Sequence, residues 1–309
     1  MKKIIIGVSA LLGSLGMVAQ QDAMFTHYMF NTLAVNPGYA GSRDALTITG
    51  LHRSQWVNFP GTPTTQTLTL HAPIKNDKLG LGLSVLNDKI GPTNTTAIYA
   101  DFAYKIAVGE KAKLSFGLKG GVNLRNNKLA SLELDEQNDQ TFAADIKSDV
   151  LPNFGFGMYY YTDKYYVGLS TPKLLQNDYK SNTTTGSTSV ASEQRHYFLI
   201  AGTVFPLTDN VKLKPTGFVK VTEAAPIEGD LTLTALFKEK LWAGVMFRTG
   251  DALGLLIGAN LTDQLALGYS FDWSYTNKTF KYNAGSHELM LRYDLIYNDA
   301  KKIRSPRYF

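Results

Sequence analysis

The residues able to carry chemistry are spread along the chain without the spacings that catalysis or metal binding requires. The histidines have no metal-ligand spacing to one another or to acidic residues; they are His27, His52, His71, His196 and His287. No serine lies in a nucleophile elbow, and the glycine pairs at 80–82 and 155–157 precede no helix that would complete a phosphate loop. Cysteine is absent, which excludes thiolate chemistry and disulfides. We therefore expect no enzyme, no cofactor and no metal.

Two kinds of charged group remain. Arg248 with Asp251, and Arg292 with Asp294, lie close in the sequence. Because isolated charges in a low-dielectric environment are costly, we interpret them as ion pairs lining an interior rather than as a catalytic set. A second group could hold calcium, although a solvated acidic loop is the favoured interpretation; it comprises Asp135, Glu136, Asp139 and Asp145.

Composition limits the partners. Only 18% of the 309 residues are charged, and the net charge of +5 is too small and too scattered to indicate nucleic-acid binding. Residues 1–19 resemble a secretory signal peptide, with Lys2 and Lys3, an apolar run and a small residue at Ala19. The alternative is a buried first helix. We expect an exported bacterial protein whose mature chain starts near Gln20.

The elements that must position these residues are strands. In 264–274, large apolar residues alternate strictly with small or polar ones, as in a two-faced strand. Fourteen such segments are predicted, at 45–55, 65–73, 79–88, 96–108, 112–125, 152–162, 164–171, 194–205, 211–222, 230–238, 241–249, 252–261, 264–274 and 287–297. The number of segments is even, as in single-chain bacterial barrels, and their polar face is rich in glycine and serine. We therefore predict an all-β fold that consists of one transmembrane antiparallel β-barrel over 45–297.

The connections separate a membrane barrel from a soluble sandwich. Those after even-numbered segments are short: IKNDK, VGEK, TDK, PLTDN, KEK and TDQ. Those after odd-numbered segments are often long, notably 126–151, 172–193 and 274–286. Outer-membrane barrels have short periplasmic turns and longer outer loops, so the sorting favours a barrel in the cell outer membrane. Both termini are then expected in the periplasm.

Two segments flank the barrel. Residues 20–44 are expected to form a short periplasmic helix and turn, since Phe25, Tyr28, Met29 and Leu33 have helical spacing and a turn signal follows at Asn36. This segment either plugs or docks at one mouth of the barrel, or packs against the first strand as a lead-in. Residues 298–309 are expected to form a basic periplasmic tail.

Local motifs carry a family resemblance. Residues 20–44, QQDAMFTHYMFNTLAVNPGYAGSRD, resemble the opening signature of the PorP/SprF family of Bacteroidetes, with Ala23-Met24 where the family usually has Pro-Gln. The stretch HRSQW followed by GTP resembles the family's R-x-Q-W…G-x-P block. Similar stretches continue through KLSFGLKGGV, LALGYSFDWS and GSHELMLRYD to the terminal SPRYF. The resemblance implies an outer-membrane barrel of the type IX secretion and gliding system.

The resemblance also implies the partners. Family members either contact periplasmic components of the secretion machinery or export and anchor one large surface adhesin, and the sequence does not separate these roles. A porin-like channel for small solutes is the competing hypothesis. The long loops at 126–151 and 172–193 are candidate contact regions. The candidate partner-binding residues are Asn36, Pro37, Tyr39, Gly41, Arg53, Trp56, Arg304, Ser305, Pro306, Arg307, Tyr308 and Phe309.

Overall fold

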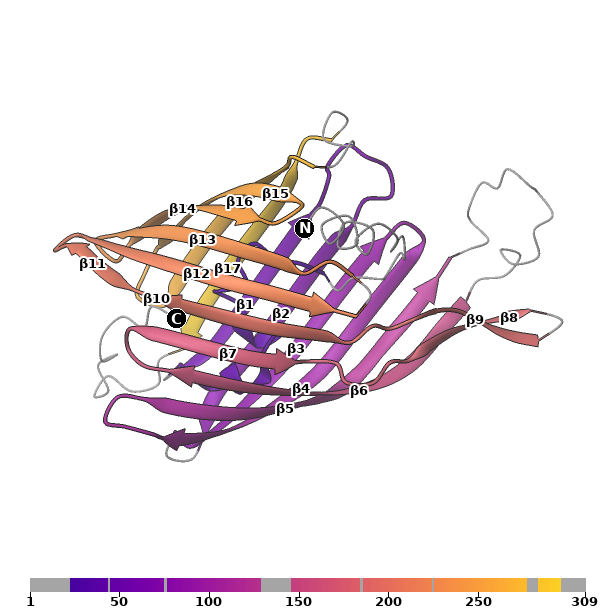
Figure 1. Cartoon of the computed structure of the whole chain (residues 1–309), viewed down its shortest axis with the longest axis horizontal. Coiled ribbons are helices and arrows are strands. Elements are labelled where there is room, and N and C mark those ends of the chain that lie inside the picture. The colour runs from indigo at the N-terminus through magenta and orange to yellow at the C-terminus, as the bar shows by residue number, and fades with distance from the viewer. Residues whose placement is uncertain are drawn as a thin grey trace, which may run out of the picture.

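Fourteen antiparallel strands form a closed barrel (Figure 1). The computed structural model describes residues 23–43, 45–74, 77–128, 146–183, 186–223, 225–276 and 283–295. The first wall strands are β1 (Leu46–Ser54), β2 (Thr64–Ile74), β3 (Leu79–Ile90), β4 (Thr93–Ala107), β5 (Lys113–Asn127), β6 (Ile146–Tyr161) and β7 (Tyr165–Thr171). The wall continues with β10 (His196–Thr203), β11 (Phe205–Thr208), β12 (Val211–Thr222), β13 (Glu228–Phe237), β14 (Leu241–Arg248), β15 (Ala252–Asn260), β16 (Leu265–Ser274) and β17 (Ser286–Leu295).

Two pairings close the wall. β10 and β11 both pair with β12 and form one wall strand interrupted at Val204. β1 pairs with β17 along its whole length, from Leu46 opposite Leu295 to Ser54 opposite His287. This pairing of the last strand with the first closes the predicted barrel. A closed sheet leaves no open edge, which is the condition for crossing a membrane with strands.

The two faces of the wall are inverted relative to a soluble protein. In β16, Leu267, Tyr269 and Trp273 are exposed, whereas Ser270 and Asp272 are buried. The same alternation is seen in strands such as β1, β4 and β12, and large apolar side chains cover the outside of the barrel. The apolar outer surface fits a lipid environment, as the predicted transmembrane barrel requires.

The connections sort to the two ends of the barrel. The short-turn end carries turns near residues 77–78, 109–112, 162–164, 209–210, 238–240 and 261–264. The long-loop end carries the connections at 55–63, 128–145, 172–195 and 275–285. A hairpin of β8 (Asp178–Thr183) and β9 (Gly186–Ser192) lies in the third of these and was not predicted. β6 also begins six residues before the predicted strand.

The N-terminal segment lies inside the barrel, which corrects its predicted periplasmic position. Its described part, residues 23–43, contains two 3-10 helices, η1 (Thr32–Ala34) and η2 (Pro37–Tyr39), and no α-helix. The apolar residues thought to form a helical stripe pack in the interior instead. Among the described residues, no helix is long and apolar enough to cross a membrane. We call residues 23–43 the plug.

The plug runs along the lumen from one end to the other. Thr26 contacts Glu288 near the start of β17, and Arg43 contacts Asp294 near its end. These two strand positions are six residues apart, about 20 Å in an extended strand. The chain therefore descends from the long-loop end to the short-turn end before it enters β1.

Candidate functional site

At the long-loop end, buried charges of the wall hold the plug backbone. Glu288 accepts hydrogen bonds from the backbone N–H of Thr26 (2.9 Å) and of His27 (2.6 Å), and its Oε1 lies 2.7 Å from His27 Nδ1. Arg53 Nη1 lies 3.3 Å from Glu288 and 2.7 Å from Asp272. All five residues are buried. Charge-assisted hydrogen bonds of this kind are about twice as strong as neutral ones, so this cluster fixes the plug.

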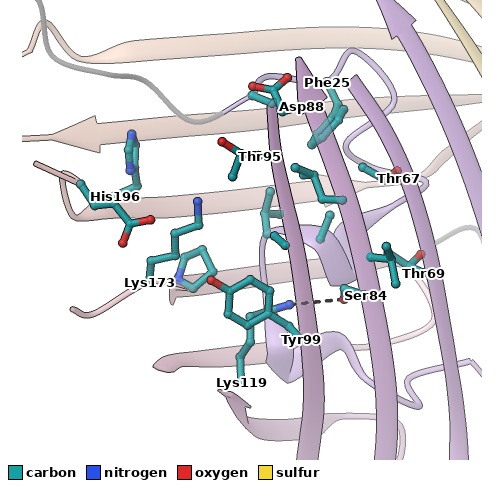
Figure 2. A pocket seen from close by; sticks show the side chains of 18 of the residues that line it. Phe25, Thr67, Thr69, Ser84, Asp88, Thr95, Tyr99, Lys119, Lys173 and His196 are labelled. Atoms are coloured by element: carbon teal, nitrogen blue, oxygen red, sulfur yellow. Dashed lines mark hydrogen bonds between the residues drawn. The ribbon is translucent and has the colours of Figure 1, made fainter. Parts of the chain in front are cut away.

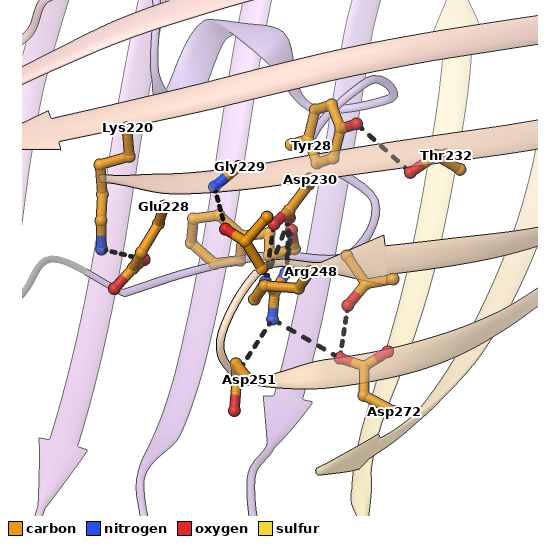
Figure 3. A network of polar contacts seen from close by, with 12 residues as sticks. Tyr28, Lys220, Glu228, Gly229, Asp230, Thr232, Arg248, Asp251 and Asp272 are labelled. Carbon is orange, nitrogen blue, oxygen red and sulfur yellow. Dashed lines mark hydrogen bonds and ion pairs between the residues drawn. The ribbon is translucent and has the colours of Figure 1, made fainter. Parts of the chain in front are cut away.

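A second ion cluster lies beside the first (Figure 3). Arg248 donates from Nε and Nη2 to the two carboxylate oxygens of Asp230, at 3.0 and 2.8 Å, and from Nη2 to the carbonyl of Phe25 at 3.4 Å. Its Nη1 lies 3.6 Å from Asp251 and 3.9 Å from Asp272. The predicted Arg248–Asp251 ion pair is present, but the closer partner is Asp230, which faces Arg248 across strands β13 and β14.

In the middle of the lumen, asparagine side chains join the plug to the wall. Asn31 donates to Thr67 at 3.0 Å and accepts from Thr69 at 2.7 Å. Asn36 donates to the carbonyl of Met158 at 3.0 Å and caps η2 by accepting from the N–H of Gly38 at 2.8 Å. Amide groups both donate and accept, so each asparagine satisfies polar groups on both sides of the contact.

Tyr28 is the largest plug side chain at this level. It is buried, and its hydroxyl lies 3.3 Å from Thr232 Oγ1 (Figure 3). Its ring lies 4.8 Å from that of Phe218. The interior is thus partly an apolar core built around aromatic plug residues.

Wall glycines let the plug backbone approach the strands. A Cβ at Gly117 would lie 2.2 Å from the backbone N of Gly38, and one at Gly80 would lie 2.0 Å from the carbonyl O of Ala40. At Gly157 it would lie 2.2 Å from Asn36 Oδ1. Glycine is needed here because any side chain would displace the plug.

The short-turn end of the plug is held through Gly41 and Arg43. Arg43 Nη2 lies 2.9 Å from Asp294, whose carboxylate also accepts from Thr47 at 2.7 Å. Arg292 Nε lies 3.6 Å from the same carboxylate, as predicted from the sequence. Gly41, whose φ of +64° favours glycine, is bonded through its N–H to His71.

A cavity of about 280 Å³ remains beside the plug (Figure 2). It lies between Phe25 and Val35 of the plug and the wall at β2–β5 and β10. One lining residue, Glu193, accepts hydrogen bonds from three asparagine amides, and another, Lys119, lies 3.0 Å from Asp101. This volume is near the lower limit for small-molecule pockets.

The predicted partner-binding residues lie apart. Asn36, Pro37, Tyr39 and Gly41 are buried inside the lumen. Arg53 is buried in the ion cluster at the long-loop end, and Trp56 lies at the same end, donating from Nε1 to Ser274 at 3.3 Å. The predicted tail residues lie outside the described residues; they are Arg304, Ser305, Pro306, Arg307, Tyr308 and Phe309.

The predicted acidic loop group at 135–145 also lies outside the described residues. No group of histidine and acidic residues that could hold a metal occurs in the part of the chain that the structure describes. Several residues that fix the plug were not singled out from the sequence: Thr26, Asp230, Asp272 and Glu288. The sequence did contain a pattern that could have identified the three acidic residues. Each lies at an inward position of an alternating strand, where a buried charge requires a partner.

A closed antiparallel barrel with an apolar outside, a polar inside and an internal N-terminal segment defines a plugged outer-membrane barrel. The family model described as type IX secretion system membrane protein PorP/SprF matches residues 17–293. The chain belongs to this family. PorP/SprF proteins are secretion-system membrane proteins and not a known enzyme family.

Solved outer-membrane proteins share the architecture at low identity. The CymD monoaromatic hydrocarbon channel is 11% identical with a TM-score of 0.51, over 92% of this chain and 95% of that one. Omp33 of Acinetobacter baumannii is 11% identical with a TM-score of 0.47, over 82% of this chain and 100% of that one. The P. putida toluene transporter TodX is 6% identical with a TM-score of 0.48, over 87% and 95%. No curated protein matches. The likeness to CymD supports the fold alone.

Proposed function

We propose that this barrel is a non-enzymatic, non-conducting anchor of the type IX secretion and gliding system. It exports or holds a secreted surface protein, or docks periplasmic parts of the machinery. The observation that carries the proposal is the plug, which crosses the lumen and is bonded to the wall at both ends. A segment fixed by buried ion pairs is costly to move, which favours a binding role over solute passage.

A porin-like channel is the competing function, and the cavity of about 280 Å³ is the feature that favours it. Barrels of sixteen to eighteen strands leave an aqueous channel, whereas eight strands enclose only side chains, so fourteen strands are intermediate. The plug occupies the space that such a channel would need. The cavity is then a remnant between plug and wall.

Conductance separates the two functions. The purified barrel, reconstituted in planar bilayers, is expected to pass no steady ionic current. The matched variant is Glu288→Ala, which removes the acceptor of the Thr26 and His27 backbone groups and is expected to produce intermittent openings. A steady current through the unaltered protein would contradict the anchoring role.

Partner capture tests the role itself. The tagged chain, cross-linked in native outer membranes and purified, is expected to retain a surface protein or periplasmic secretion components. Two deletion variants show which end of the barrel binds the partner. One lacks residues 178–192, the β8–β9 hairpin, and the other lacks residues 299–309. Loss of a surface protein from the hairpin deletion would indicate the role in exporting or anchoring that protein. Loss of periplasmic components from the 299–309 deletion would indicate the role in docking the secretion machinery. Retention of no specific partner by the full chain would refute the proposal.

A further inference from the structure

Cationic side chains gather around one aromatic ring at the short-turn mouth of the lumen. Lys214 Nζ lies 5.1 Å from the centre of the Phe30 ring, and the Arg292 guanidinium lies 5.8 Å from it. Arg292 and Arg43 both contact Asp294. We call Phe30, Arg43, Lys214, Arg292 and Asp294 the cationic mouth. Its ion-pair residues are only slightly exposed, with 13% of the Arg292 side chain and 11% of the Arg43 side chain accessible.

Arg292 is the least satisfied of these cations. Its guanidinium has five N–H donors in a planar fork. No described residue accepts a hydrogen bond from its Nε, which is buried, and its ion pair with Asp294 is long, at 3.6 Å. That carboxylate already accepts from Arg43 at 2.9 Å and from Thr47 at 2.7 Å. Arg292 therefore retains donors for a planar, two-oxygen acceptor.

The charge around the mouth is also one-sided. Within the cationic mouth, two arginines, Arg43 and Arg292, contact the one carboxylate of Asp294. At the rim, Lys212 is paired with Glu239 and adds no net charge. This end of the barrel therefore attracts negative charge before any contact is made.

We propose that the cationic mouth receives carboxylates of an acidic segment in a protein partner, with Arg292 making the two-point contact. Strands enclose the mouth on all sides, so a flexible peptide reaches it more readily than a lipid headgroup in the surrounding bilayer. The inference deepens the proposed anchoring function by giving the chemistry of one contact, and it rests on that function.

A labelled deca-glutamate peptide tests the site on the full-length protein in lipid nanodiscs. We expect saturable binding that weakens as salt increases, because exposed charge attraction is screened. Arg292→Gln is expected to weaken binding at least tenfold, and Arg292→Lys by an intermediate factor because lysine keeps the charge but loses the fork. Lys111→Gln, an exposed cation of the β4–β5 turn at the same end, is the matched control and is expected to bind like the unaltered protein.

Three results would overturn the proposal. One is unaltered binding by Arg292→Gln in protein that is shown to be folded by its heat-dependent gel mobility. Another is equal binding of deca-lysine. The third is loss of binding on removal of 299–309 while Arg292→Gln still binds, which would place the contact in the tail. The peptide assay needs no secreted partner, so its failure is distinct from failure of the anchoring role.

Discussion

The two ends of the plug are held in different ways. At the long-loop end, Arg53 and Arg248 face four carboxylates, those of Asp230, Asp251, Asp272 and Glu288, and the closest contacts are 2.7 to 2.8 Å. At the short-turn end, two arginines, Arg43 and Arg292, share the carboxylate of Asp294. The first arrangement satisfies buried charge internally, as stability requires. The arrangement at the short-turn end leaves hydrogen-bond donors that could bind an additional negatively charged group. The lumen thus has one end suited to retention and one suited to recognition.

Strand register explains the difference. Arg53 lies opposite Glu288 in the β1–β17 ladder, and Arg248 lies opposite Asp230 in the β13–β14 ladder. Arg292, by contrast, lies between Thr49 and Ala266 on its two neighbouring strands. Side chains directly opposite on adjacent strands are close enough to interact, so the wall supplies a partner at the long-loop end. At the short-turn end Arg292 has no acidic partner across either ladder.

The largest effect is expected from Glu288→Ala. It removes the acceptor of two plug N–H groups and leaves Arg53 with one carboxylate fewer. Breaking a buried ion pair by removing one partner costs about 3–5 kcal/mol. Urea unfolding in lipid vesicles measures the change. The matched control, Glu239→Ala, breaks the exposed rim pair with Lys212 and should cost less than about 1 kcal/mol. Equal effects of the two variants would contradict the retention role of the long-loop end.

A smaller effect is expected in the middle of the plug, from Gly117→Ala. Its Cβ would meet the backbone of Pro37 and Gly38 at 2.2 Å, and overpacking of this kind costs about 1–3 kcal/mol. Gly217→Ala on β12, where a Cβ would meet nothing within 4 Å, is the control. Unfolding of both variants is measured under the same conditions. If Gly117→Ala were as stable as the control, the close approach of plug and wall would be refuted.

The strands of the barrel wall could be predicted from the sequence, but the plug inside the barrel and its contacts with the wall could not. Period-two alternation is a local property, so fourteen strands, their faces and the Arg292–Asp294 contact follow from nearby residues. The contact of His27 with Glu288 joins residues 261 positions apart and depends on closure of the barrel. The helical spacing of Phe25, Tyr28, Met29 and Leu33 was misleading, because interior packing around the plug requires apolar residues without requiring a helix. Ser270 belongs to the small or polar face of its alternating strand, but nothing local indicated that this face would be fully buried.

The smallest effect is expected from Arg292→Met at the short-turn end. The substitution removes one ion pair at 3.6 Å and no hydrogen bond to a described residue, and it relieves the desolvation of a mostly buried cation. These terms oppose each other, so the free energy of unfolding should change by less than about 1 kcal/mol in either direction. Arg248→Met, which breaks the bidentate contact with Asp230, should cost about 3–5 kcal/mol in the same assay. If Arg292→Met destabilised the barrel as strongly as Arg248→Met, Arg292 would stabilise the fold as Arg248 does. The proposed difference between the two ends of the lumen would then be wrong.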